Sequence, residues 1–157
     1  MKKILFALGL SLTFLSATAL EVNKSTLKEF NSFEYETPLG RQMKISKKTE
    51  LIIVAFEKDT GKLVNSYLKE QDPFYMPKRH VVYIADIHNM PSIITNMFAL
   101  PKLQKYKHPI YLHYDEEFEK FVPNEEEKVT LIRFGDGIVI SVEYITTAEE
   151  LKVAIEK

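Results

Sequence analysis

Two runs of consecutive apolar residues mark the centre of the chain: 51–56 reads LIIVAF and 81–85 reads VVYIA. Runs of this length without polar alternation are typical of strands buried on both faces, as in a parallel sheet covered by helices. Each run precedes a segment with apolar residues at helical spacing, which predicts two strand–helix units. In the second helix, the positions expected on the buried face are Ile93, Ile94, Met97 and Phe98.

Capping residues and prolines predict where these helices begin and end. The first helix is expected to begin near Asp59 or Thr60, since either side chain can accept a hydrogen bond from a free N–H of the first turn. Pro91 falls in the first turn of the second helix, where a missing N–H is tolerated. Pro101 is expected to kink or end that helix, because its ring clashes with the preceding turn.

The N-terminal part of the chain predicts shorter elements. Residues 21–32 are polar and indicate a short helix or a loosely held arm. Residues 33–45 predict two short strands around a turn at 37–40, which reads TPLG and has proline and glycine where a type I turn favours them.

The C-terminal third predicts a strand, a hairpin and two helices. Residues 109–114 indicate a short strand, and 115–121 a helical turn with its two phenylalanines facing inward. Residues 129–144 predict a β-hairpin around the turn GDG, whose glycines allow positive φ. A last helix is expected from residue 146 on, where TTAEE fits a capping box.

Composition excludes several functions. The chain has 21 basic and 22 acidic residues, a formal net charge of −1, and no long block of basic residues. Nucleic acid and anionic membrane surfaces are therefore not expected as partners. It has no cysteine, which excludes disulfides, thiolate catalysis and lipid attachment through a cysteine.

The first residues are typical of a bacterial secretory signal. Two lysines precede an apolar stretch that ends in the small-x-small pattern ATA at 17–19. Residues 1–19 are therefore predicted to be a signal peptide, cleaved between Ala19 and Leu20. The stretch is shorter than the roughly 20 residues of a membrane span, and an uncleaved anchor is the alternative. We expect a periplasmic protein without stable membrane insertion after cleavage.

The C-terminal end of the chain resembles that of thioredoxins. Residues 129–151 combine an apolar strand, a glycine-containing turn, a second strand and a helix that begins TAEEL. With the two strand–helix units, this order resembles the thioredoxin superfamily over residues 49–157, with 20–48 as an N-terminal arm and β-hairpin. The insert at 109–122 is similar to the extra strand and short helix of peroxiredoxin-like members. The resemblance implies a three-layer α/β fold with a central mixed sheet.

Two hallmarks of that superfamily are absent. Its Cys-x-x-Cys would fall at 58–62, which reads KDTGK, and its cis-proline would fall before the hairpin, where Glu127 and Lys128 stand. The resemblance therefore implies the scaffold without its redox chemistry. The expected function is a non-enzymatic binding domain for another periplasmic protein or peptide, without a cofactor. A cysteine-independent enzyme of unknown reaction is an alternative.

The candidate binding residues follow from the expected sheet. Ligands of open α/β sheets gather at the carboxyl ends of the strands, and the free N–H groups of a helix start favour anions. The loop before the hairpin is expected at the same edge. The candidates are Asp59, Thr60, Gly61, Lys62, His88, Met90 and Lys128. The alternative at 58–62 is that Asp59 only caps its helix.

His88 and Met90 also define a second class of function, metal or cofactor handling, with Met76 or His80 completing the ligand set. No two histidines have the spacing of ligands on one helix face, and no metal ligand is assigned.

The segment 74–76, which reads FYM, lies in a proline-bounded loop expected at the opposite edge of the sheet. It is either an exposed contact patch or part of the core, and both interpretations stay open.

Overall fold

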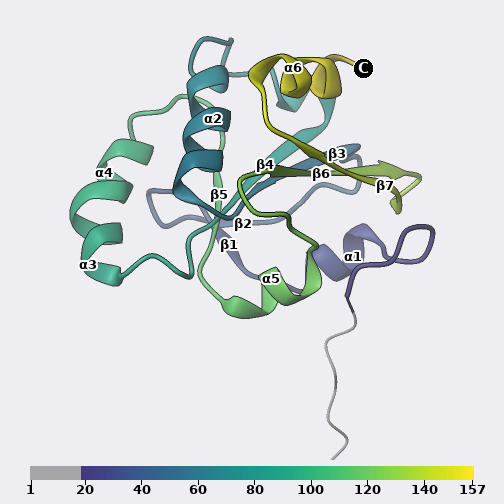
Figure 1. Cartoon of the computed structure of the whole chain (residues 1–157), viewed down its shortest axis with the longest axis horizontal. Helices are drawn as coiled ribbons and strands as arrows, with labels where there is room; N and C mark the ends of the chain where they lie inside the picture. The colour runs from purple at the N-terminus through teal and green to yellow at the C-terminus, as the bar shows by residue number, and fades with distance from the viewer. Residues whose placement is uncertain (1–18) are drawn as a thin grey trace, which may run out of the picture.

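The computed structural model describes residues 19–157, so the predicted signal peptide lies, except for Ala19, outside the described residues. The chain forms a seven-stranded sheet with helices on both faces (Figure 1). The strands are β1 (Tyr35–Glu36), β2 (Gln42–Met43), β3 (Leu51–Ala55), β4 (Val81–Asp86), β5 (Tyr111–His113), β6 (Val129–Gly135) and β7 (Ile138–Ile145). The helices are α1 (Leu27–Phe30), α2 (Lys58–Leu68), α3 (Ser92–Ile94), α4 (Leu100–Leu103), α5 (Glu116–Phe121) and α6 (Ala148–Glu156), with a 3₁₀ turn at Pro77–Arg79 and a π-helical segment at Thr95–Ala99.

The sheet is mixed, with the strand order β2-β1-β5-β4-β3-β6-β7. The central strands β3, β4 and β5 are parallel, whereas β6, β7, β1 and β2 pair antiparallel with their neighbours. Every residue of β3 and β4 is buried, as their uninterrupted apolar runs predict. The predicted α/β fold with a central mixed sheet is confirmed.

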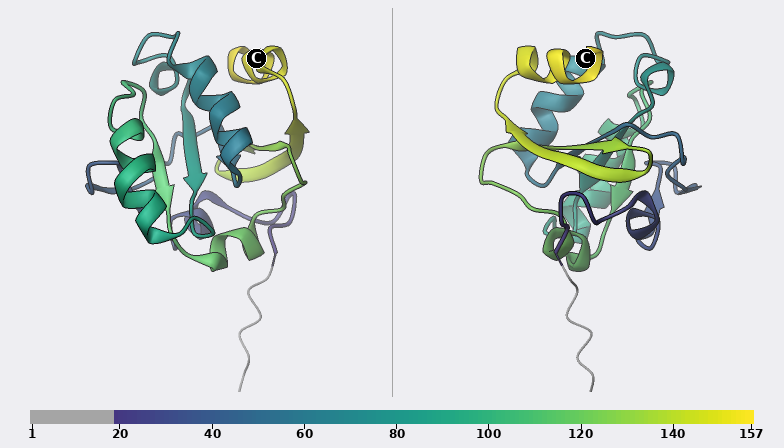
Figure 2. Two further views of the ribbon diagram at one scale, coloured as in Figure 1. Left: turned by 60° about the vertical axis from the view of Figure 1, so that its left-hand side comes forward. Right: turned by 90° about the vertical axis from the view of Figure 1, so that its right-hand side faces the viewer.

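Alternate residues of the sheet face two different helical layers (Figure 2). Ile52 and Val54 belong to the cluster packed under α1 and α5, whereas Leu51, Ile53 and Ala55 belong to the cluster under α2 and α6. This alternation follows from the two-residue period of a strand. The result is three layers, with α1 and α5 on one face and α2, α6 and the 92–103 segment on the other.

The face under α1 and α5 is closed by aromatic rings. Phe30 and Phe118 are fully buried, and their rings meet edge to face with centroids 6.3 Å apart. Phe33, Phe121 and Phe134 extend the same cluster. Edge-to-face pairs of this kind add to the free energy gained from burial. The predicted inward orientation of both phenylalanines of α5 is correct.

The N-terminal segment 20–48 is part of this same body. Leu27, Phe30 and Tyr35 are buried in the aromatic layer, and β1 pairs with β5 through Glu36 and Leu112. The polar pattern of residues 21–32 therefore contains the two apolar residues that anchor the segment. A short, held helix is formed rather than a loose arm.

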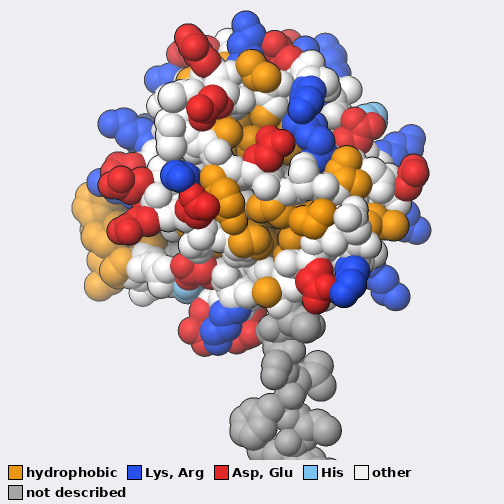
Figure 3. Space-filling view, turned by 45° about the vertical axis from the view of Figure 1, so that its right-hand side comes forward, with side chains coloured by type: hydrophobic (Ala, Val, Ile, Leu, Met, Phe, Trp, Pro, Cys, Tyr) orange, Lys and Arg blue, Asp and Glu red, His pale blue; other side chains and the backbone are white. Residues whose placement is uncertain are grey.

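The second predicted helix differs from expectation in its burial. Its expected core residues are exposed: 68% of the surface of Ile93, 66% of Met97 and 63% of Phe98 is accessible, and Ile94 is exposed too. The residue of this stretch that is buried is Thr95. Figure 3 shows a hydrophobic cluster at the left edge of the molecule, over this segment. The spacing predicted an amphipathic helix correctly but could not show that no layer covers it.

Of the two outcomes expected at Pro101, a kink or an end of the helix, the helix does not end there. The backbone widens to a π-helical segment at Thr95–Ala99 and continues as α4 to Leu103. Pro101 lies within the first turn of α4. The proline has no N–H to donate, and the wider turn before it removes the need for a regular α-helical bond at that position.

The loop at 74–76 divides between the two open interpretations. Phe74 is 62% exposed, whereas Tyr75 and Met76 are buried in the core under α2 and α6. The Tyr75 hydroxyl lies 2.6 Å from that of Tyr67. The loop is therefore mostly a core anchor with one exposed ring.

Candidate functional site

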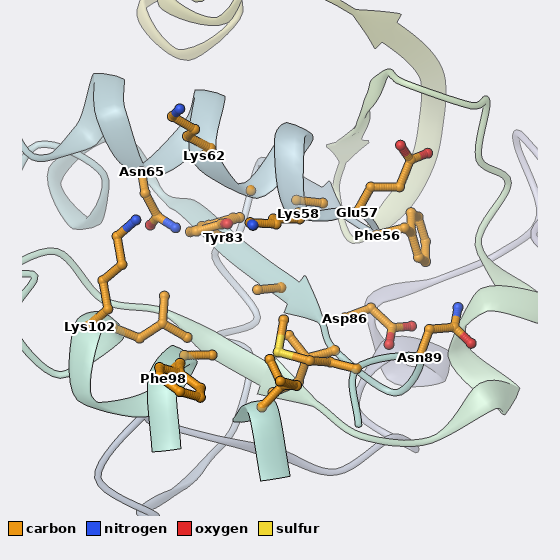
Figure 4. A pocket seen from close by; sticks show the side chains of 18 of the residues that line it. Phe56, Glu57, Lys58, Lys62, Asn65, Tyr83, Asp86, Asn89, Phe98 and Lys102 are labelled. Atoms are coloured by element: carbon orange, nitrogen blue, oxygen red, sulfur yellow. The ribbon is translucent and has the colours of Figure 1, made fainter. Parts of the chain in front are cut away.

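A pocket lies where the parallel strands β3 and β4 end, between α2 and the 92–103 segment (Figure 4). Its volume is about 620 Å³, within the roughly 300–1,000 Å³ typical of small-molecule sites. Its apolar walls include Phe56, Ile87, Met90, Ile94, Phe98 and Leu103. The pocket is at the sheet edge where open α/β folds bind ligands.

The wall formed by α2 is fixed at its first turn. Glu57, not Asp59 or Thr60, is the N-cap residue, which corrects the predicted start of the helix by two to three residues. The Glu57 N–H donates to the Thr60 hydroxyl oxygen at 3.1 Å, and that hydroxyl donates to the Glu57 carbonyl at 3.0 Å. Thr60 thus closes the first turn from inside. The prediction missed this because a threonine at the third helical position can serve a cap that precedes it.

Gly61 keeps the pocket open. A Cβ at this position would meet the Tyr83 hydroxyl at 3.7 Å, an ordinary contact distance. Gly61 lies inside α2, where glycine costs about 1 kcal/mol relative to alanine. The helix therefore gives up stability at the point where a side chain would enter the cavity.

Tyr83 forms the floor of the pocket. The side chain is fully buried, and among the described residues its hydroxyl makes no hydrogen bond of good geometry, although the Asn65 amide is close enough to oppose the rise in its pKa. Burial raises the pKa of Tyr83, so the hydroxyl stays protonated and can donate. A buried hydroxyl without a partner is uncommon, because leaving it unsatisfied costs free energy.

Behind this floor lies a buried amide–imidazole pair. The Asn65 Oδ1 and the His108 Nε2 are 2.9 Å apart, and the His108 Nδ1 has no partner. Burial lowers the pKa of His108 to about 4. The imidazole is therefore neutral at pH 7, with Nε2 donating to the amide oxygen.

Three lysines line the mouth: Lys58 and Lys62 on α2 and Lys102 on α4. Among residues 19–157, none of the three takes part in an ion pair or a side-chain hydrogen bond. In Figure 4, Lys102 reaches from α4 toward α2. The mouth is therefore positively charged.

The end of β4 holds a second polar arrangement. The Asp86 Oδ1 lies 2.6 Å from the His88 Nδ1, and the His88 Nε2 lies 3.0 Å from the Glu119 Oε2 of α5. Burial raises the pKa of Asp86, and its hydrogen bonds to His88 oppose that shift. His88 thus ties the β4 end to α5 and has both nitrogens engaged.

The structure brings some predicted residues together and separates others. Gly61, Lys62 and Met90 line the pocket. The remaining candidates, which do not line it, are Asp59, Thr60, His88 and Lys128. Asp59 is exposed in the first turn of α2, and the Lys128 ammonium pairs with the Glu125 carboxylate at 2.7 Å.

The loop before the hairpin does reach this edge, as expected. The Glu127 N–H donates to the Glu57 Oε1 at 3.0 Å, which joins the loop to the start of α2. Glu127 has a φ of 61°, the left-handed region that a non-glycine residue seldom adopts.

The ligand set proposed for a metal is not assembled. His80 and Met76 precede β4, whereas His88 and Met90 follow it. Six strand residues separate the two pairs, roughly 20 Å at about 3.3 Å per residue. Met76 is also buried in the core. Within the described part of the chain, no group of three or more histidine, aspartate or glutamate side chains could hold a metal ion.

Comparison with known proteins identifies the fold. Three solved structures are similar: StoA from Bacillus subtilis (TM-score 0.52, 19% identity, 78% of this chain and 94% of that chain), Xanthomonas campestris peroxiredoxin Q (0.51, 13%, 90% and 98%) and a SCO1/SenC family lipoprotein from Bacillus anthracis (0.51, 12%, 88% and 93%). At these identities the likeness shows the fold alone. No protein-family model matches the chain, and no curated protein matches it.

The protein therefore has a thioredoxin-like fold, in agreement with the resemblance of its sequence to that superfamily. It has no cysteine with which to carry out thiol chemistry. The site residues that sequence reasoning missed are Tyr83, Asn65, Phe98 and Lys102. Tyr83 gave a signal, because it carries the one polar side-chain atom of the apolar run 81–85. Phe98 and Lys102 gave none, because their place depends on where the second helix lies.

Proposed function

We propose that this protein is an exported, non-enzymatic binding domain whose ligand occupies the pocket between α2 and the 92–103 segment. The observation that carries the proposal is a preformed, mostly apolar cavity of about 620 Å³ at the carboxyl ends of β3 and β4. Such a cavity with a few convergent polar groups is the usual form of a ligand site. Glycine at position 61 and an unpartnered Tyr83 hydroxyl support the same proposal.

The absence of cysteine supports a binding role rather than catalysis of the thiol type. The residues at the start of α2 are Lys58, Asp59, Thr60 and Gly61, and none has a nucleophile paired with a base. Thr60 is buried, and its hydroxyl already donates to a carbonyl of the same turn. Catalysis by a hydroxyl would need a general base within hydrogen-bond reach.

Export rests on the predicted signal peptide, and the first described residues support the proposed cleavage point. Leu20 is buried against the aromatic layer, and its N–H donates to the Phe121 carbonyl at 2.9 Å. The chain that would remain after cleavage thus begins with a packed residue. Within residues 19–157, no helix has the length and apolar character needed to cross a membrane.

The binding role is tested with Nile red, a neutral dye whose fluorescence rises in apolar surroundings. We expect saturable binding of one dye per chain. Gly61→Leu fills the cavity from inside α2 and should abolish binding. Ser66→Leu adds the same side chain to an exposed position of the same helix and should leave binding unchanged. Equal binding by the two variants would refute the proposed site.

The non-enzymatic part of the proposal has its own test. The purified protein is expected neither to reduce insulin disulfides nor to consume hydrogen peroxide, because both reactions in this fold need a thiolate. Turnover of either substrate above that of heat-denatured protein would contradict the proposal.

A further inference from the structure

The two ends of the pocket differ in chemistry. One end holds the Tyr83 hydroxyl with Lys58 and Lys102 (Figure 4). The remaining wall is mostly apolar, with Ile87, Met90, Ile94, Phe98 and Leu103, and it also carries Glu57, Asp86 and Asn89. A ligand that matches both ends has one compact polar group and one extended apolar part.

The charge at the polar end is not explained by the stability of the fold. Lys58 is the first residue of α2, where the helix dipole disfavours a cation. Lys62 lies four residues further on, and like charges at this spacing repel each other. Neither has an acidic partner among the described residues. An anionic ligand would supply the missing partner.

The two acidic residues at the pocket do not neutralise these lysines. The Glu57 carboxylate accepts the Glu127 N–H. The Asp86 carboxylate accepts the N–H of His88 and pairs with its ring, on the side that faces α5. Each carboxylate has one oxygen engaged in this way, although the Asp86 Oδ2 has no partner among the described residues. Three lysines against two carboxylates leave the pocket lining with a formal charge of +1 (3 − 2).

The Tyr83 hydroxyl provides an observation independent of charge. It is fully buried, lines the cavity and, among residues 19–157, makes no hydrogen bond of good geometry, the Asn65 amide being its polar neighbour. Tyrosine can donate one hydrogen bond, and a carboxylate or phosphate oxygen accepts strongly. A ligand anion placed at the Lys58 end would satisfy this buried donor.

We propose that the pocket binds an anionic amphiphile with a single alkyl chain. This inference rests on the proposed function and names the class of ligand that occupies that same site. The anionic head lies between Lys58 and Lys102 and accepts a hydrogen bond from Tyr83. The chain runs along the apolar wall and beneath Phe98.

The test uses three probes with the same twelve-carbon chain: dodecanoate, dodecanol and dodecyltrimethylammonium, each titrated calorimetrically below its micelle concentration. We expect dodecanoate to bind about tenfold tighter than dodecanol, because charge-assisted hydrogen bonds exceed neutral ones. The ammonium probe should bind most weakly. Lys58→Gln with Lys102→Gln should remove the preference for dodecanoate and leave the affinity for dodecanol unchanged.

Two further variants make the result specific. The control variant Lys69→Gln with Lys78→Gln makes the same two substitutions at exposed lysines outside the pocket. It should keep the preference for dodecanoate over dodecanol. Tyr83→Phe should weaken dodecanoate about fivefold, the loss of one hydrogen bond, and dodecanol less, because a neutral hydroxyl oxygen accepts more weakly than a carboxylate. Its melting temperature checks that the fold is kept.

The outcomes separate the inference from the proposed function. Equal affinity for dodecanoate and dodecanol, or tighter binding of the ammonium probe, would overturn the inference while Nile red binding still supports a binding domain. A preference that survives the double lysine variant would also overturn it. Failure of Nile red to bind would remove the proposed function itself.

Discussion

The two faces of the sheet carry opposite kinds of surface. Under α1 and α5, the rings of Phe30, Phe118 and Phe121 pack edge to face. All three side chains are buried. Under α2 and the 92–103 segment, a cavity of about 620 Å³ is bounded by Phe98, which is 63% exposed. Both faces derive from the same alternating strands. The difference lies in how closely the covering helices approach.

We expect the closed face to stabilise the fold and the face with the pocket to bind the ligand. Close packing of aromatic rings leaves no room for a ligand and tolerates little change. On the other face, the segment 92–103 leaves apolar side chains exposed beside the pocket, where they can contact a ligand. The molecule thus keeps its rigid layer and its adaptable layer on opposite sides of one sheet. Four predictions test the separation, in order of decreasing effect.

Phe118→Ala is expected to lower the free energy of unfolding by about 3–5 kcal/mol, because it leaves a cavity in the closed layer. Chemical denaturation followed by circular dichroism measures the change. A loss below about 1 kcal/mol would show that the aromatic layer is not the stabilising face.

The neutral state of His108 is expected to make the pocket side sensitive to acid. Its pKa of about 4 in the folded protein is below the ordinary 6.5, so the unfolded chain binds more protons between these values. Stability is therefore complete above pH 6.5 and falls as the pH decreases to 4, by up to roughly 3 kcal/mol.

His108→Gln should flatten the pH dependence of unfolding in that window. His80→Asn, at an exposed position with a φ of 57° that asparagine tolerates, should leave it unchanged. Equal slopes in the parent protein and His108→Gln would contradict the assignment.

Gly61→Ala is expected to raise stability by about 0.5–1 kcal/mol, because alanine favours the helix and the new Cβ makes only an ordinary contact. Gly40→Ala makes the same chemical change at a φ of 81° and should instead destabilise by about 1 kcal/mol. Thermal unfolding distinguishes the two. Destabilisation by Gly61→Ala would mean that the cavity wall is already tightly packed.

Phe98→Ala should change stability by less than about 0.5 kcal/mol, because the ring is mostly exposed. The same substitution should weaken Nile red and dodecanoate binding, since the ring forms part of the pocket wall. Comparison with Phe118→Ala then tests the contrast directly: one phenylalanine stabilises the fold and the other contributes to the site. Equal stability losses would remove the distinction.

The order of the strands and helices, and the inward orientation of the two phenylalanines of α5, could be predicted from the amino-acid sequence. The runs at 51–56 and 81–85 are typical of strands buried on both faces, and the hairpin at 129–144 follows from two apolar strands around glycines. These are local patterns, and each constrains its own segment. The absence of cysteine likewise required no structure to exclude thiol chemistry.

The full set of residues that line the pocket could not be predicted from the sequence, because it depends on how the segment 92–103 packs against α2. The apolar spacing at Ile93, Met97 and Phe98 is the same whether a helix is covered or exposed, because periodicity records one helix and not its neighbour. Glu57 became the helix cap through Thr60 and the loop at Glu127, a contact between residues 70 positions apart. The cavity arises from the distance between two helices, a quantity set by the packing of the whole core.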